Sequence, residues 1–193
     1  PQSGQVRIDG YDAGDVSLRS LRRQMGIMLQ DSFIFSGSVL ENIRYGKLDA
    51  TMEEVRRAAN IAMADDFIMA MEQQYDTPLG EGGSRLSQGQ KQLISFARTI
   101  LSDPRILILD EATSSIDTET EGLVQEALQR MLEGRTSFII AHRLSTIKAC
   151  DKIMFVDDGR ILECGSHDEL IARRGAYYQL YTAQMDMGRA VTA

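Results

Sequence analysis

The stretch ILILDEATSSID, residues 106–117, decides how this chain is interpreted. Four apolar residues lead directly into two adjacent acids, Asp110 and Glu111. A short, almost continuous apolar run that ends at polar residues is typical of a parallel-sheet strand buried on both faces. Ligands of open α/β sheets bind beyond the carboxyl ends of such strands. The pattern therefore predicts that the two carboxylates stand at a ligand-binding edge.

Two neighbouring carboxylates at the end of a rigid strand can divide two tasks in phosphoryl transfer. Mg²⁺ prefers oxygen ligands in octahedral geometry, so Asp110 is suited to hold the ion directly or through water. The following Glu111 is suited to orient a water molecule for in-line attack on a phosphoryl group. The strand pattern by itself leaves open the alternative that these acids are only the polar end of a buried strand.

The order of predicted elements indicates an α/β fold with a mainly parallel sheet. Strands are predicted over four segments, and helical segments alternate with them; the strand segments are 5–9, 24–30, 105–110 and 137–142. Residues 39–74 look helical, because apolar residues recur there at the spacing of one helix face.

Local signals predict where several elements begin and end. After a Gly-rich loop over 77–85, Ser87 is the predicted N-cap of a helix that ends before Asp103-Pro104. Asp158-Gly159 lies between two apolar runs and predicts a tight hairpin. Ser166 and Glu169 form the pattern of a capping box, which opens the last helical segment.

Composition limits the classes of function. The net charge of −7 disfavours a general nucleic-acid or anionic-membrane binder, so no nucleic-acid partner is expected. No apolar run approaches the roughly 20 residues that cross a bilayer. The cysteines, Cys150 and Cys164, have no framework spacing, which fits a reducing compartment. Pro1 stands where an initiator Met is expected, so the start looks cut or processed.

Short motifs follow one another along the whole chain. They are Gln30 at the end of GIMLQ, LSQGQ at 86–90, ILILDE at 106–111, SSID at 114–117 and IIAHR at 139–143. In this order they resemble the nucleotide-binding domain of ABC transporters, and FIFSGSVLENI at 33–43 resembles the exporter type. The resemblance covers about residues 1–185, with Gln88 where the family signature usually has a glycine.

The resemblance implies ATP and Mg²⁺ as cofactors, and ATP hydrolysis coupled to export. It implies catalytic roles for Glu111 and His142, and a metal-binding role for Asp110 together with Gln30. The residues that it implies for nucleotide binding are Ser87, Gly89, Gln90, Gln30 and Asp117. The residues themselves support part of this, because helix N-termini such as that at Ser87 attract anions. Simpler roles remain open: Asp117 and Ser87 can cap helices, and His142 can be a core histidine.

The implied fold is a P-loop NTPase (RecA-like) core with a mainly parallel sheet, lacking its N-terminal strands. The expected core comprises 1–31 and 105–165, the inserted helical subdomain 32–104, and the C-terminal helical tail 166–193. The phosphate-binding Walker A pattern G-x-x-x-x-G-K-[ST] is absent, since Gly46-Lys47 is followed by Leu48. We therefore expect an N-terminally incomplete domain that by itself hydrolyses ATP negligibly.

The resemblance also implies partners and location. A second nucleotide-binding domain would join head to tail, and transmembrane domains of the exporter would receive the motion, at the cytoplasmic face of the cell membrane. Two alternatives remain. The chain could be a non-catalytic interaction module that donates LSQGQ to a partner's ATP site, or it could be a soluble ABC ATPase.

Overall fold

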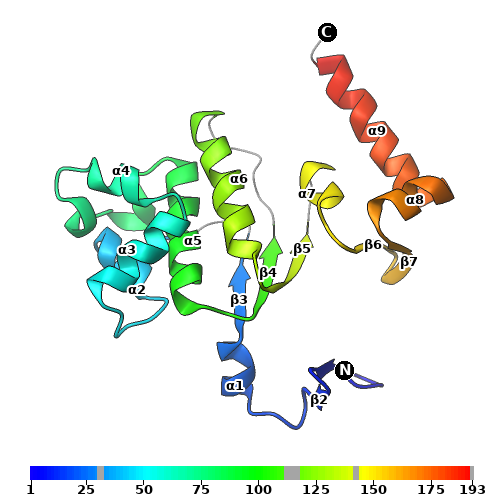
Figure 1. The fold of residues 1–193 in the computed structure, drawn as a ribbon, viewed down its shortest axis with the longest axis horizontal. Coiled ribbons are helices and arrows are strands. Elements are labelled where there is room, and N and C mark those ends of the chain that lie inside the picture. Colours follow the sequence, from blue (N-terminus) through cyan, green and yellow to red (C-terminus); the bar gives the residue numbers. More distant parts are fainter. Residues whose placement is uncertain (30–32, 111–117, 141–143, 192–193) are drawn as a thin grey trace. The chain divides into compact units, whose positions relative to one another are not determined.

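The fold is that of a computed structural model in which residues 1–29, 33–110, 118–140 and 144–191 are described. The chain divides into two compact units, Pro1–Ile140 and Ala141–Ala193. The elements of the first unit are β1 (Arg7–Ile8), β2 (Tyr11–Asp12), α1 (Leu18–Arg23), β3 (Met25–Met28), α2 (Val39–Arg44), α3 (Met52–Ile61), α4 (Asp65–Met69), α5 (Gln88–Ser102), β4 (Ile106–Asp110), α6 (Thr118–Leu132) and β5 (Thr136–Ile140), with short 3-10 helices at Gln74–Asp76 and Glu81–Gly83 (Figure 1).

A three-stranded parallel sheet in the order β3-β4-β5 carries the predicted site strand at its centre. The register pairs Leu107 of β4 with Gly26 on one side and with Ser137 on the other. Leu107 and Leu109 are 0% and 5% exposed because they face a core shared with α5 and α6. At Gly26 a Cβ would lie 2.8 Å from Pro104 Cγ, so glycine lets β3 approach the turn that follows α5.

The opposite face of this sheet is not covered by the described residues of the first unit. Ile27, Phe138 and Ile140 are 60%, 51% and 55% exposed, and Ile106 and Ile108 of β4 are half-buried. The sequence predicts burial on both faces, and that prediction is wrong within the first unit, because the helices of that unit pack against one face only. An apolar pattern reports that a residue favours burial, but it does not identify what covers it.

The segment between β3 and β4 is mostly helical and packs around α5. In place of one helical region over 39–74, the structure has α2, α3 and α4. Capping boxes open α2 (Ser38 with Glu41) and α3 (Thr51 with Glu54), and Met63, at φ 56°, lies in the turn between α3 and α4. The core of this segment is mainly apolar and includes Val39, Ile43, Val55, Ala59, Ile68, Leu79, Leu93 and Phe96.

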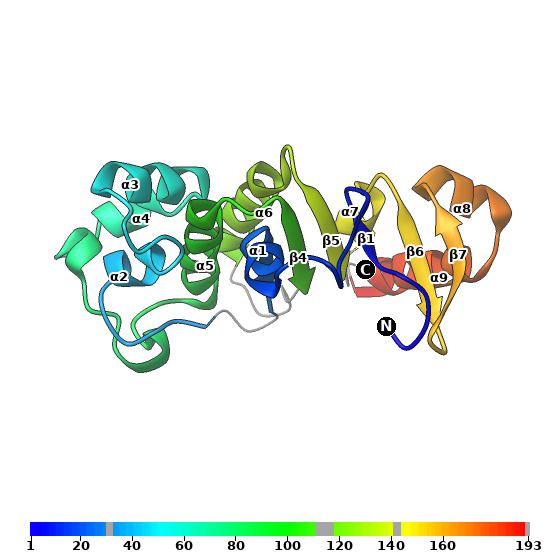
Figure 2. The ribbon, with the colours of Figure 1, turned by 90° about the horizontal axis from the view of Figure 1, so that it is seen from below.

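The second unit contains α7 (Leu144–Lys148), β6 (Ile153–Asp157), β7 (Arg160–Gly165), α8 (His167–Arg173) and α9 (Ala176–Val191). Figure 2 shows β6 and β7 side by side as an antiparallel hairpin, with α8 and α9 packed against β7. Asp158 and Gly159 connect the strands with φ of 44° and 69°, the left-handed conformation of a tight hairpin turn, which confirms the prediction. The capping box of Ser166 and Glu169 is also present at the start of α8.

The predicted strand over 5–9 is shorter than expected. Only Arg7–Ile8 is extended as β1, and it pairs with Tyr11–Asp12 of β2 across a turn at Asp9-Gly10. The same Asp-Gly signal that marks the later hairpin is therefore present here too. Within the described ranges no helix is both long and apolar enough to cross a membrane.

Candidate functional site

The start of α5 combines an exposed turn with a capping box. The hydroxyl of Ser87 accepts a hydrogen bond from the backbone N–H of Gln90 (3.3 Å), and the Gln90 side chain accepts one from the Ser87 N–H (3.1 Å). Ser87 and Gln88 are exposed, whereas Gly89 is buried. Because α5 is 15 residues long, its dipole and its first free N–H groups make this end suited to an anion. The predicted N-cap at Ser87 is confirmed. The anion-binding role of this helix end stays a prediction.

Asp110 is the last residue of β4 and stands at the carboxyl edge of the sheet. It lies opposite Ile140 of β5 and on the same face as Ile106 and Ile108, which is the face that α5 and α6 do not cover. Its side chain is half-buried and forms no ion pair with any described residue. A carboxylate in this position remains available as an oxygen ligand for Mg²⁺.

The strands that precede the other predicted site residues end at the same edge. β3, β4 and β5 run parallel and in register, so their carboxyl ends lie together. Along the chain, Gln30 follows β3 by two residues, Glu111 follows Asp110 directly, and His142 follows β5 by two residues. Gln30, Glu111, His142 and the predicted nucleotide-binding Asp117 lie outside the described residues, so their roles stay predictions.

Arg135, which the sequence did not single out, joins the end of α5 to the sheet. Its guanidinium donates to the carbonyls of Pro104 (3.0 Å) and Met131 (2.8 Å), and it forms an ion pair with Asp103 (2.8 Å). These bonds hold the turn between α5 and β4 against the end of α6. The helix that starts at Ser87 and the strand that ends at Asp110 therefore share one firmly held connection.

An aromatic cluster follows the predicted Gln30 position in the chain. The ring of Phe35 lies 4.9 Å from that of Phe33 and 4.5 Å from that of Tyr45, between ring centroids. Phe33 and Tyr45 are 66% and 60% exposed. Arg98 of α5 places its guanidinium 4.9 Å from the Phe35 ring centroid, and burial lowers the pKa of Arg98. The only sequence signal for Arg98 is a basic residue between apolar positions of the α5 core face.

A polar network lies inside the helical segment. Asp65 is 8% exposed and accepts a hydrogen bond from the Tyr75 hydroxyl (2.5 Å). It also forms an ion pair with Arg56 (3.3 Å). Burial by itself raises the pKa of Asp65, but the bonds from Tyr75 and Arg56 outweigh it and the pKa is lowered. Burial and the Asp65 carboxylate raise the pKa of Tyr75. The network holds α3, α4 and the following 3-10 helix together.

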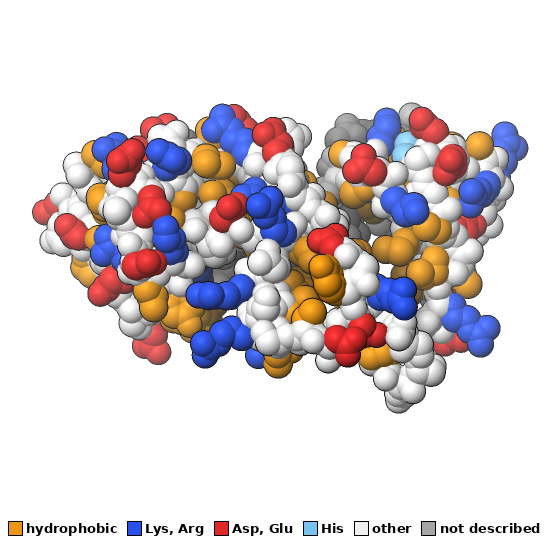
Figure 3. Space-filling view, turned by 60° about the horizontal axis from the view of Figure 1, so that its bottom comes forward, with side chains coloured by type: hydrophobic (Ala, Val, Ile, Leu, Met, Phe, Trp, Pro, Cys, Tyr) orange, Lys and Arg blue, Asp and Glu red, His pale blue; other side chains and the backbone are white. Residues whose placement is uncertain are grey.

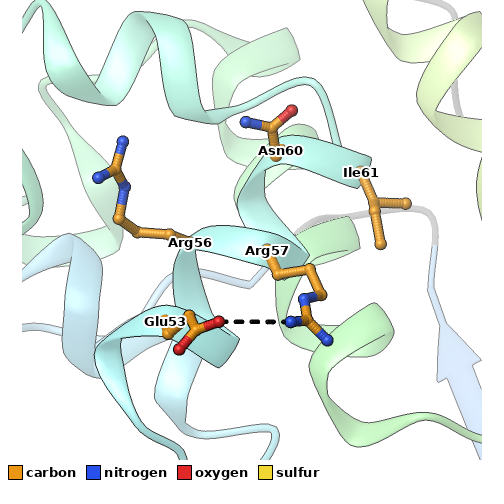
Figure 4. A pocket seen from close by; sticks show the side chains of 5 residues that line it. All are labelled: Glu53, Arg56, Arg57, Asn60 and Ile61. Carbon is orange, nitrogen blue, oxygen red and sulfur yellow. Dashed lines mark hydrogen bonds and ion pairs between the residues drawn. The ribbon is translucent and has the colours of Figure 1, made fainter.

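An open hollow lies along α3, away from the sheet edge. Its volume is about 690 Å³, and Figure 4 shows that one helix supplies its lining: Glu53, Arg56, Arg57, Asn60 and Ile61. Arg57 pairs with Glu53 (3.4 Å) and Arg56 pairs with Asp65. Both cations are already engaged, so the hollow offers no ready anion site. Figure 3 shows acidic and basic side chains interspersed over the helical segment, and on this face the described residues form no large patch of one sign.

Comparison with known proteins gives a consistent result. Residues 1–114 match the family described as ABC transporter. The chain is 55% identical over 186 residues to an uncharacterized ABC transporter ATP-binding protein, YfiC, of Bacillus subtilis, covering 96% of this chain and 31% of that protein. It is 50% identical to the Beta-(1-->2)glucan export ATP-binding/permease protein NdvA of Rhodopseudomonas palustris, covering 95% and 30%. The chain thus spans about a third of the length of these relatives.

The fold comparison agrees with the sequence comparison. The structure of a bacterial Atm1-family ABC exporter with ATP bound matches 95% of this chain and 32% of that chain, with a TM-score of 0.86 and 43% identity. The predicted fold class, an α/β P-loop NTPase, is confirmed by this match and by the parallel sheet flanked with helices.

Proposed function

Because this chain belongs to the ABC transporter family, we propose that it acts as the ATP-binding and ATP-hydrolysing domain of an exporter. One observation carries the proposal. Three parallel strands end at one edge, and β4 presents the half-buried Asp110 there, which forms no ion pair with the described residues, beside the chain positions of Gln30, Glu111 and His142. This is the edge at which open α/β sheets bind their ligands.

Asp110 and Gln30 would hold Mg²⁺, whose charge, when bound, neutralises the charge that develops on the phosphates. Glu111 would orient the attacking water, and His142 would contact the terminal phosphate. Asp117 would lie beside the nucleotide.

Ser87, Gly89 and Gln90 would serve an ATP held by a second nucleotide-binding domain. The capping box of Ser87 and Gln90 stiffens the first turn of α5, and the exposed side of that turn can meet an anion from outside the chain. Donors supplied by a second domain complete the site only when the two domains close. Binding of ATP would therefore favour the closed pair, and hydrolysis would release it.

The transmembrane partner would contact the segment after Gln30. Aromatic side chains are enriched in protein interfaces. Phe33 and Tyr45 are exposed, and each contacts the ring of Phe35, so the three rings form one cluster. One relative, NdvA, is described as an ATP-binding/permease protein. This arrangement would place the chain at the cytoplasmic face of the membrane. The predicted division into core, helical subdomain and tail belongs to the same proposal.

A second candidate function follows from the absent G-x-x-x-x-G-K-[ST] pattern. The 193 residues by themselves would hydrolyse ATP negligibly, because the pattern supplies the backbone donors and the lysine that hold the phosphates. Alone, the chain would donate Ser87 and Gly89 to a partner's ATP. Phosphate release from the purified 193 residues at a turnover typical of enzymes would contradict this.

The proposal predicts a specific defect for Gly89→Asp in the complete exporter polypeptide that carries this chain. A carboxylate at the start of α5 would repel the phosphates of the other domain's ATP, so hydrolysis should fall by about 100-fold. Binding of ATP to the domain that carries the substitution should persist, because Gly89 would contact the ATP held by the second domain. Filter binding of labelled ATP and phosphate release measure the two effects separately.

A control for the chemical change alone is Gly122→Asp, which makes the same substitution in α6 at an exposed position with open space around its Cβ. That variant should retain both binding and hydrolysis. If Gly89→Asp hydrolyses ATP as the control does, with a melting temperature equal to that of the wild type, α5 does not face a nucleotide.

A further inference from the structure

We infer that Arg98 is a positioning residue that ties the nucleotide-facing end of α5 to the segment after Gln30. The inference rests on the proposed function, since it assumes that Ser87 meets ATP and that the segment around Phe33 and Tyr45 meets the membrane helices. Neither the motifs nor the relatives' names assign a role to this arginine.

The hydrogen bonds of Arg98 span two separate pieces of backbone. One terminal nitrogen donates to the carbonyl of Phe33 (2.9 Å), and Nε donates to the carbonyl of Asn42 in α2 (2.9 Å). The other terminal nitrogen donates to the side-chain oxygen of Asn42 (3.0 Å). A single side chain on α5 thereby fixes both the loop that follows β3 and the helix that follows the loop.

Asn42 extends the same network. It is 0% exposed, and its side-chain oxygen also accepts from the backbone N–H of Phe35 (2.9 Å), while its amide donates to the carbonyls of Phe35 and Ser38 (3.0 Å each). The Phe35 backbone is therefore held on both its N–H and its C=O. Because Arg98 binds Asn42 directly, displacement of the guanidinium loosens the aromatic cluster as well as the loop.

The charge of Arg98 is balanced without an acid among the described residues. Its partners are carbonyl oxygens and the ring faces of Phe35 (4.9 Å) and Tyr45 (6.0 Å). Such an arrangement depends on the planar fork of guanidinium, which donates in several fixed directions and stacks on rings. A lysine keeps the charge, but its single nitrogen cannot reach three acceptors in these directions.

The backbone of α5 at Arg98 is also in direct contact with the end of α2. A Cβ on Gly46 would lie 2.1 Å from the carbonyl oxygen of Arg98, so only glycine allows the approach. Ser87 and Arg98 lie on the same unbroken helix, about 16 Å apart along its axis. If the first turn of α5 moves, Arg98 therefore moves with it and shifts both the loop after β3 and α2.

The test is hydrogen exchange in the complete exporter polypeptide that carries this chain, with ATP, Mg²⁺ and vanadate as the probe. In the wild type, the probe should slow exchange both at 87–95 and at 33–45. In Arg98→Lys, protection at 87–95 should remain while protection at 33–45 is lost, and the Phe35 amide should exchange about tenfold faster without nucleotide. Arg105→Lys, at an exposed arginine that precedes β4, is the matched control and should behave as the wild type.

The outcomes separate the inference from the proposed function. An absence of protection at 87–95 in the wild type contradicts the proposed function. Protection at 33–45 that persists in Arg98→Lys, or that is absent in the wild type while 87–95 is protected, overturns the inference. Arg98→Gln repeats the test without the charge. Faster exchange in both variants throughout α3 and α5 also overturns it, because a general structural role then suffices.

Discussion

The helical segment around α5 and the parallel sheet bury their apolar residues to different extents. In the helical segment, Phe96 and Leu93 are 2% and 0% exposed, and capping boxes bind backbone N–H groups at the N-termini of α2, α3 and α5. In the sheet, Leu107 is 0% exposed, but Ile27 and Phe138 on the other face are 60% and 51% exposed. The apolar core of the helical segment is covered by residues of that segment. In the sheet, one face is covered in this way and the other face is exposed.

This difference separates stability from function in the molecule. Asp110 stands on the open face of the sheet, at the edge proposed for ATP, whereas the cores of the helical segment and of the covered face fix where that edge lies. Residues that bind or react with a ligand must be accessible to it, and buried residues hold them in position. Substitutions on the covered side should therefore affect the free energy of unfolding more than matched substitutions on the open face.

The largest contrast is expected between two phenylalanines. Phe96→Ala should lower the free energy of unfolding by about 3–5 kcal/mol, because it leaves a cavity in a packed core. Phe138→Ala should lower it by about 1 kcal/mol, because about half of the residue's surface is already exposed. Chemical denaturation of the purified variants, followed by circular dichroism, measures both. Equal losses would show that the sheet's open face is covered in solution.

A smaller effect is expected from the polar network of the helical segment. Tyr75→Phe removes the hydroxyl that donates to Asp65 and should lower the free energy of unfolding by about 1–2 kcal/mol at neutral pH. Phenylalanine keeps the ring, so the loss reports the hydrogen bond rather than the packing. Tyr11→Phe, at an exposed tyrosine, is the control and should change stability little.

The same variant has a predicted pH dependence. The pKa of Asp65 is lowered in the folded protein, so its bonds stabilise the fold above the ordinary aspartate pKa of about 3.9. This stabilisation is lost as the pH falls through the lowered pKa. The difference between wild type and Tyr75→Phe should therefore shrink below about pH 4. A difference that stays constant down to pH 2 would mean that Asp65 is not the charged partner.

Local chemistry made much of the fold predictable from sequence. The helix predicted from Ser87 to the residue before Asp103 corresponds to α5, and the turn predicted at Asp158-Gly159 connects β6 and β7. These signals work because caps and left-handed turns depend on a few neighbouring residues. The division of 39–74 into α2, α3 and α4 was missed, since its breaks involve ordinary residues such as Met63, in a left-handed conformation.

Contacts between distant residues were not predictable in the same way. Arg98 binds Asn42 at a separation of 56 residues and Phe33 at 65, and no spacing rule relates them. The open face of the sheet was also missed, because Ile27 and Phe138 have the same apolar character as buried residues. At the site, the sequence predicted that Asp110 stands at the end of a strand in a parallel sheet, and the structure confirms this, but which strands flank it came from the structure alone. The roles of Gln30, Glu111, Asp117 and His142 stay predictions.

The central claim, that the edge at Asp110 hydrolyses ATP, is tested most directly by Glu111→Gln in the complete exporter polypeptide. The amide keeps the size of the side chain but cannot act as a base, so hydrolysis should fall by at least about 100-fold. Binding of labelled ATP should be retained, and Glu133→Gln, at an exposed acid that follows α6, should hydrolyse ATP as the wild type does. A Glu111→Gln variant with wild-type steady-state hydrolysis would contradict the account.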